Sequence, residues 1–166
     1  DSAMATSSSD PALHSWLSVP HGSDFPIRHI PFGIFSAPGR PMRPGTRVGD
    51  MVVDLFVLAE SDLLTSTGIP RVVLMETKLN RLLKEGAGSV RALRQRLIEL
   101  LSEGNTELRD NDALRQRALV AASEVTMHVP AHIGDYTDFY SSRQHAYNVG
   151  CMFRDPANAL LPNWLH

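Results

Sequence analysis

The chain has 166 residues, of which 43% are hydrophobic and 20% are charged, and its formal net charge is −2. This composition is typical of a globular protein with one domain, or with one domain and part of a second. The charge argues against a nucleic-acid partner, because a nucleic-acid surface needs a concentrated basic stripe. The arginines between positions 91 and 117 alternate with leucines at helical spacing, so we interpret them as a solvated helix face.

Cys151 is the single cysteine, so no internal disulfide is possible and a reducing compartment is favoured. It stands in the apolar run from Val149 to Phe153, and we interpret it as a buried structural thiol rather than a nucleophile. No stretch approaches the roughly 18 apolar residues of a membrane span, and the N-terminus lacks the pattern of a signal peptide. We therefore predict a cytoplasmic protein without a membrane partner.

Residues 1–12 are mostly small and polar, and we predict that they form a disordered tail or tag. From Trp16 to Leu58, short β-strand patterns alternate with glycines and prolines, which favours a small barrel. The run from Arg47 to Val53 carries the clearest hairpin signal. Its two central residues are Gly49-Asp50, with the glycine first, as a type II′ turn requires.

The middle of the chain, from about Val72 to Val125, has a helical pattern. It predicts a short helix over Thr77–Lys84 that ends at Gly86. A longer helix is predicted to begin after a cap at Ser89 and to close at Gly104. This longer helix has one apolar stripe, formed by Val90, Leu93, Leu97, Ile98 and Leu101.

A third helix is predicted to begin after a cap at Asp110 or Asn111. Its apolar face would be formed by Leu114, Ala118, Ala121 and Val125. We interpret the apolar stripes of these helices as core packing rather than as a groove for a partner.

The segment from Met127 to Arg154 is crowded with polar, aromatic and ionisable side chains and has no helix or strand period, so we predict a site-forming loop. Asp138 offers a hard oxygen ligand, Tyr140 a phenol and His145 a titratable imidazole, and Arg154 follows shortly. Such a set could bind a hard cation, hold an anionic substrate and activate water. Spacing alone leaves ordinary structural roles open: a loop aspartate, a packed ring, a core histidine and a surface ion pair.

The run Asp135–His145 resembles the catalytic-loop signature of the fumarylacetoacetase family. Further matches to the family follow in the same order along the chain: Ser23–Ile27 with Pro31–Phe35, Val48–Asp50 with Val53–Leu55, Glu107–Arg109 with Leu114–Ala118, and Asn158–His166. The resemblance covers nearly all of the chain after residue 12, although positions 61–104 match only in pattern.

The resemblance implies a role for each candidate residue. Asp138 would be one carboxylate ligand of a divalent cation, Ca²⁺ or Mg²⁺, and Tyr140 would hydrogen-bond a small-molecule substrate. His145 would be the general base that takes a proton from water, and Arg154 would bind a substrate carboxylate or carbonyl oxygen. The implied reaction is hydrolysis of the carbon–carbon bond of fumarylacetoacetate to fumarate and acetoacetate, in tyrosine and phenylalanine catabolism.

The order of the patterns, strands first and helices after, predicts an α+β fold. Within it, the resemblance implies a small SH3-like β-barrel with flanking helices over residues 13–129, then the first part of a mixed β-roll over residues 130–166. The other metal ligands of the family lie beyond this chain, so we expect the isolated chain to be metal-free and inactive, and the full-length protein to be a homodimer. We also expect an apolar surface formed by Phe139, Met152, Phe153, Leu160, Leu161 and Trp164.

Two other functions remain open at this point. The first is a related activity on the same fold, decarboxylation or isomerisation of an oxo-acid. The second is a non-catalytic barrel domain that binds a partner or regulates assembly. We interpret His128, His132 and Tyr136, to which the resemblance assigns no role, as structural residues.

Overall fold

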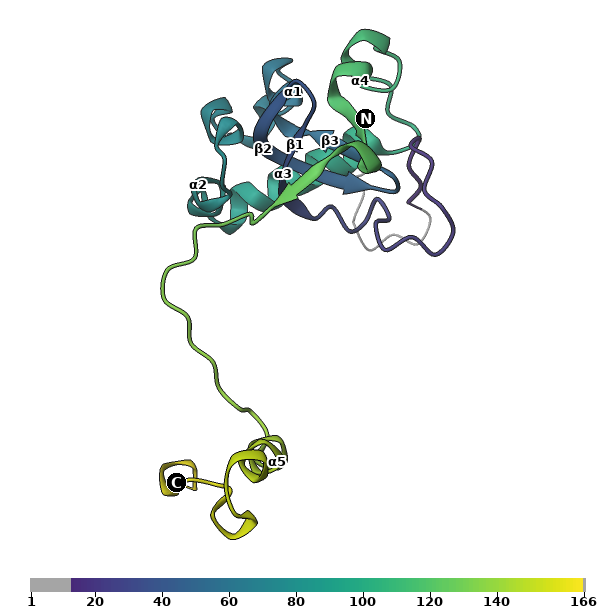
Figure 1. Ribbon diagram of the computed structural model, residues 1–166. Helices are drawn as coiled ribbons and strands as arrows, with labels where there is room; N and C mark the ends of the chain where they lie inside the picture. The colour runs from purple at the N-terminus through teal and green to yellow at the C-terminus, as the bar shows by residue number, and fades with distance from the viewer. Residues whose placement is uncertain (1–12, 166) are drawn as a thin grey trace. The chain divides into compact units, whose positions relative to one another are not determined.

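A computed structural model describes residues 13–165 (Figure 1). The tail predicted for residues 1–12 therefore lies outside the described residues. The chain divides between His132 and Ile133 into two compact units. Within residues 13–165, none of the helices combines the length and the apolar character that crossing a bilayer requires.

The first unit is built on one five-stranded antiparallel sheet with the order β4-β3-β2-β1-β5. The strands are β1 (Phe32–Ala37), β2 (Arg40–Val48), β3 (Met51–Asp54), β4 (Leu119–Ala121) and β5 (Thr126–His128). The two late strands, β4 and β5, form opposite edges of the sheet, so the sheet is open. The α+β class is thus confirmed, whereas the predicted closing of the strands into a barrel is not.

The hairpin between β2 and β3 has the predicted turn. Val48 pairs with Met51, and Gly49 has a φ of 55° while Asp50 has no positive φ, which is the combination of a type II′ turn. A side chain at Gly49 would also meet the carbonyl oxygen of Ser18, which lies 2.6 Å from the position of an ideal Cβ. Both the turn and this close approach therefore require glycine.

Helix α1 (Leu55–Glu60) corrects the prediction that the strand pattern continues to Leu58. Asp54 ends β3 and caps this helix, because its carboxylate accepts a hydrogen bond from the Val57 N–H at 3.3 Å. The same carboxylate is fully buried and forms ion pairs with Arg40 at 3.0 Å and Arg43 at 2.6 Å. Asp54 therefore joins the sheet, the helix and two arginines.

Helices α2 (Asn80–Lys84) and α3 (Gly86–Leu101) lie where two helices were predicted, but with different ends. Gly86, predicted to end the first helix, is the first residue of α3. Ser89 lies inside α3 rather than capping it. The helix stops at Leu101, with Ser102 and not Gly104 as its C-terminal cap. The predicted apolar stripe is confirmed: four of its residues are buried and Val90 packs against the same core.

Helix α4 (Asp112–Ala118) begins after Asn111, whose side chain accepts a hydrogen bond from the Leu114 N–H at 3.1 Å, so one of the two predicted caps is confirmed. The predicted continuation to Val125 is wrong. After Ala118 the chain pairs with β3 as strand β4, which places Val120 opposite Val52. The β-branched Val120 is buried there.

Hydrophobic side chains pack on both faces of the sheet. The large core includes Ile34, Val48 and Val53 together with the buried faces of the helices. A smaller cluster, made of Phe35, Val52 and Val120, lies on the alternate strand positions.

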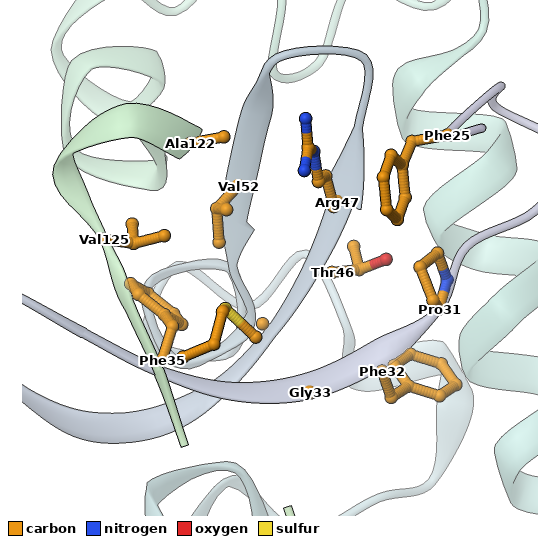
Figure 2. Close-up of a pocket in the computed structure, with 12 residues that line it drawn as sticks. Phe25, Pro31, Phe32, Gly33, Phe35, Thr46, Arg47, Val52, Ala122 and Val125 are labelled. Atoms are coloured by element: carbon orange, nitrogen blue, oxygen red, sulfur yellow. The ribbon is translucent and has the colours of Figure 1, made fainter. Parts of the chain in front are cut away.

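A hollow of about 230 Å³ adjoins the smaller cluster (Figure 2). Figure 2 shows Phe25 and Phe32 on one side of it and Phe35 and Val52 on the other. The guanidinium of Arg47 lies 4.1 Å from the centre of the Phe25 ring, which is a cation–π contact. None of the residues predicted to carry the chemistry lines this hollow.

Candidate active site

The segment from Met127 to Arg154, predicted to be a loop, contains regular structure at both ends. Strand β5 covers its first residues, and helix α5 (Arg143–Phe153) covers the last part. Between them, residues 133–142 are exposed and form neither helix nor strand. The prediction that no period runs through the segment is therefore wrong, and His145 lies on a helix rather than in a loop.

Ser142 determines where α5 begins. Its hydroxyl accepts a hydrogen bond from the backbone N–H of His145 at 3.3 Å, and its own backbone is extended. A serine in this position satisfies one of the free N–H groups at the start of a helix. The imidazole of His145 consequently lies in the first turn of α5, directly after the extended segment that carries Tyr140.

Tyr140 and His145 lie side by side. Their ring centres are 5.2 Å apart and the ring planes meet at 64°, an edge-to-face contact of the kind that aromatic rings prefer. Both residues are exposed. The structure therefore brings together the phenol and the imidazole that the motif places five positions apart.

Arg154 lies at the other end of α5, where it is the C-terminal cap. Its backbone N–H donates to the Gly150 carbonyl at 2.9 Å, and its guanidinium lies 3.4 Å from the Ala159 carbonyl oxygen. Arg154 and Tyr140 line the same hollow of about 180 Å³. One cation and one phenol therefore border a single space in the second unit.

Asp138 lies apart from this hollow. It belongs to the extended segment two positions before Tyr140, its side chain is exposed, and it does not line the hollow. Within residues 13–165, no three histidine, cysteine, aspartate or glutamate side chains are grouped to hold a metal ion. A carboxylate is the kind of ligand that Ca²⁺ and Mg²⁺ prefer, but a Ca²⁺ site takes about six to eight oxygens. Asp138 thus fits such a cation only as one ligand among several.

Two further ionisable side chains of the segment from Met127 to Arg154, Tyr147 and His128, have local partners. Hydrogen bonding with the Cys151 side chain raises the pKa of the Tyr147 hydroxyl, one helical turn earlier on α5. Cys151 is half-buried, whereas a buried thiol was predicted. In the first unit, the His128 ring nitrogen lies 2.8 Å from the Ser36 hydroxyl, which agrees with a structural role for this histidine.

The predicted apolar surface of the second unit is present in part. Phe139, Met152 and Phe153 are each more than three-quarters exposed, and Leu161 is exposed as well. The two other predicted members, Leu160 and Trp164, are half-buried beside the hollow of α5.

Gly150 allows the second unit to pack, and the sequence interpretation did not identify it. The glycine lies on the buried face of α5, one turn after Ala146. An ideal Cβ at this position would lie 2.0 Å from the carbonyl oxygen and 2.7 Å from the carbonyl carbon of Ala159. The helix therefore approaches the backbone of the following segment more closely than any side chain permits. Small residues one helical turn apart are the only sequence signal of this contact.

Replacing Gly150 with alanine is expected to separate α5 from the segment around Ala159. Overpacking of this kind costs roughly 1–3 kcal/mol, and the contacted atoms are backbone atoms that cannot rotate away. Amide hydrogen exchange in α5 of the G150A variant should be faster than in the wild type, while exchange in the first unit stays unchanged. The matched control is Gly88→Ala in α3, where an added Cβ meets nothing within 4 Å. Equal protection of α5 in wild type and G150A would contradict the close contact.

The fold and the candidate site define an α+β chain with a phenol, an imidazole and a guanidinium grouped in its second unit. Residues 28–130 match the family model described as "Fumarylacetoacetase N-terminal". The chain belongs to this family.

The matching relatives are named fumarylacetoacetases. The chain is 48% identical over 155 residues to the protein of Mus musculus and 45% identical over 155 residues to that of Homo sapiens. It is 39% identical over 154 residues to the protein of Arabidopsis thaliana. Each alignment covers 92% of this chain and 36–37% of the relative, so the chain spans little more than a third of these relatives' length.

Proposed function

We propose that the full-length protein is a fumarylacetoacetase, which hydrolyses the carbon–carbon bond of fumarylacetoacetate to fumarate and acetoacetate in tyrosine catabolism. One observation carries this proposal: Tyr140 and Arg154 line the same hollow, and the ring of His145 packs against that of Tyr140. The names of the relatives support it, as does the run Asp135–His145, which resembles the catalytic-loop signature of the family.

The three side chains suit three parts of this reaction. His145 would take a proton from water, because a neutral imidazole is a competent base near neutral pH. The resulting hydroxide would attack the carbonyl carbon, the carbon–carbon bond would break, and the departing carbon would take up the proton that His145 had taken from water. Tyr140 would donate a hydrogen bond to the substrate, and the guanidinium of Arg154 would pair with a substrate carboxylate.

Asp138 would hold a divalent cation, Ca²⁺ or Mg²⁺, together with ligands from outside this chain. The chemistry that such a cation supplies is polarisation of a carbonyl and stabilisation of the negative charge that develops as the bond breaks. The remaining steps, which position the substrate and move the proton of water, are assigned to Tyr140, His145 and Arg154.

We further propose that the full-length protein is cytoplasmic and, from the resemblance to the family, that it is a homodimer. In it, the open sheet would be part of an SH3-like fold, and the residues from 130 onward would begin a mixed β-roll. The isolated chain would be inactive, because Asp138 is a single carboxylate and about six to eight oxygens are needed to coordinate calcium.

The full-length protein is expected to remove the diketone absorbance of fumarylacetoacetate and to release fumarate and acetoacetate in equal amounts. A chelator should abolish this activity, and added Ca²⁺ or Mg²⁺ should restore it. Absorbance and chromatography of the products measure both effects. Turnover of an oxo-acid by decarboxylation or isomerisation, with the diketone left intact, would contradict the hydrolase. The absence of turnover of either substrate would instead favour a non-catalytic domain.

A further inference from the structure

Asn80, the first residue of α2, holds the main chain of His132 through both atoms of its side-chain amide. Its Nδ2 donates to the His132 carbonyl oxygen at 2.9 Å, and its Oδ1 accepts from the His132 N–H at 2.7 Å. Asparagine can make this contact because one amide carries both a donor and an acceptor. The side chain of His132 takes no part in it.

Two neighbouring residues hold the same stretch. The Leu79 N–H donates to the Pro130 carbonyl at 2.7 Å, and the Lys78 ammonium donates to the Val129 carbonyl at 2.7 Å. We call these four hydrogen bonds the Asn80 clamp. All of them lie within the first unit, and they bring three consecutive residues against the last four residues of that unit.

The Asn80 clamp contains the last hydrogen bonds that hold the main chain before the run Asp135–His145. Among the described residues, the main chain from 133 to 141 makes no hydrogen bond, and the next attachment is the cap of α5 at Ser142. Asp138 and Tyr140 both lie in this interval. If the clamp opened, the unattached stretch would extend back to residue 129, because β5 ends at His128.

We propose that Asn80 is a positioning residue for the site described under the proposed function, on which this inference rests. Each residue that is held in one conformation before a ligand binds lowers the entropy lost on binding. A segment with fewer conformations spends a larger fraction of its time in the arrangement that binds cation and substrate. The apparent dissociation constant rises in proportion as that fraction falls.

A purely structural role for Asn80 predicts something different. Asn80 is half-buried, His132 is exposed, and neither residue belongs to the hydrophobic core of the first unit. Loss of the clamp should therefore leave the sheet and its helices folded. A positioning role changes cation affinity and turnover without changing the stability of the first unit, whereas a structural role changes that stability.

The test uses the full-length protein, stripped of metal with a chelator and titrated with Ca²⁺ in a calorimeter. The N80A variant is expected to bind Ca²⁺ roughly two- to tenfold more weakly, since a net hydrogen bond of about 0.5–1.5 kcal/mol corresponds to about that factor. Its kcat/KM for fumarylacetoacetate should fall by a similar factor. Hydrogen exchange of the His132 amide, whose N–H donates to Asn80, should accelerate, while the protection of the sheet stays at the wild-type level.

The His132→Ala variant is the matched control, because the clamp contacts only the main chain of this residue. It should bind Ca²⁺ and turn over substrate as the wild type does. The Asn80→Asp variant keeps the acceptor for the His132 N–H but sets a carboxylate oxygen against the His132 carbonyl oxygen, so it too should bind Ca²⁺ more weakly than the wild type. If N80A fails to fold, N80D tests the positioning role in its place.

Three results would overturn the positioning role: wild-type Ca²⁺ affinity and kcat/KM in N80A or, if N80A does not fold, in N80D; an equal loss in H132A; or a loss that accompanies destabilisation of the sheet. A wild-type protein that binds no Ca²⁺ and leaves fumarylacetoacetate intact would overturn the proposed function, and the positioning role with it. If the wild-type protein binds Ca²⁺ and cleaves fumarylacetoacetate, and N80A does both equally well, the positioning role alone is overturned.

Discussion

Replacing His145 with alanine in the full-length protein is expected to lower kcat for fumarylacetoacetate cleavage by roughly 10²–10⁴-fold, the usual contribution of a general base. The variant should fold normally. His145 is exposed in the first turn of α5, and Ser142 contacts only its backbone N–H, so the cap survives the substitution. Alanine is also a better helix former than histidine. The loss of diketone absorbance at saturating substrate measures the effect.

Two controls separate the base from general damage. His132→Ala removes another exposed histidine of the same part of the chain and should leave kcat at the wild-type level. Exogenous imidazole should restore part of the activity of H145A, because it can occupy the space that the side chain leaves. Full activity of H145A without added imidazole would remove His145 from the mechanism.

The second large effect is expected at Asp54, in the first unit. Substitution by alanine should lower the free energy of unfolding by roughly 3–5 kcal/mol, the usual cost of removing one partner from a buried ion pair. The fully buried carboxylate pairs with Arg40 and Arg43, whose side chains are 22% and 14% exposed. The substitution leaves both guanidinium groups without this partner and removes the cap of α1.

Urea denaturation of the 166-residue chain can measure this loss. A Trp164→Phe background leaves Trp16 as the only tryptophan of the chain. Its indole N–H donates to the Leu100 carbonyl at 2.9 Å, so its fluorescence reports on the first unit.

Asp50→Ala is the matched control for Asp54→Ala. Asp50 also faces an arginine, Arg47, but at 3.5 Å and with 73% of its side chain exposed. Exposed pairs contribute roughly 0–1 kcal/mol. If Asp54→Ala cost no more than Asp50→Ala, the buried pairing would not stabilise the first unit.

Local signals in the sequence predicted the elements whose cause is local. The turn at Gly49-Asp50 follows from the φ that glycine allows, and the cap at Asn111 follows from its side-chain acceptor. The stripe of α3 follows from helical periodicity. Each of these depends on residues within a few positions of one another, so composition and spacing suffice.

Elements that depend on distant partners were not predicted. Helix α4 ends at Ala118 because the next residues pair with β3, which precedes them by more than 60 positions. The same long-range pairing leaves β4 and β5 at opposite edges of the sheet, which the strand pattern alone does not reveal.

Helix α1 was missed for a different reason, because a short apolar run fits a strand and a buried helix equally well.

The candidate site likewise contains features that the sequence predicted and features that it did not. The motif pointed to Tyr140 and His145, and the structure brings their rings together. Helix α5 was missed because its buried face consists of Ala146 and Gly150, which are too small to produce a hydrophobic period.

The contact of Asn80 with His132 has a consequence for how related sequences vary. Because the asparagine bonds only to main-chain atoms, position 132 is free to accept almost any residue that has a backbone N–H. Position 80 is restricted, since few side chains combine a donor and an acceptor at this length. One partner should therefore be constant across orthologues while the other drifts, and methods that search for correlated substitutions would not detect the pair.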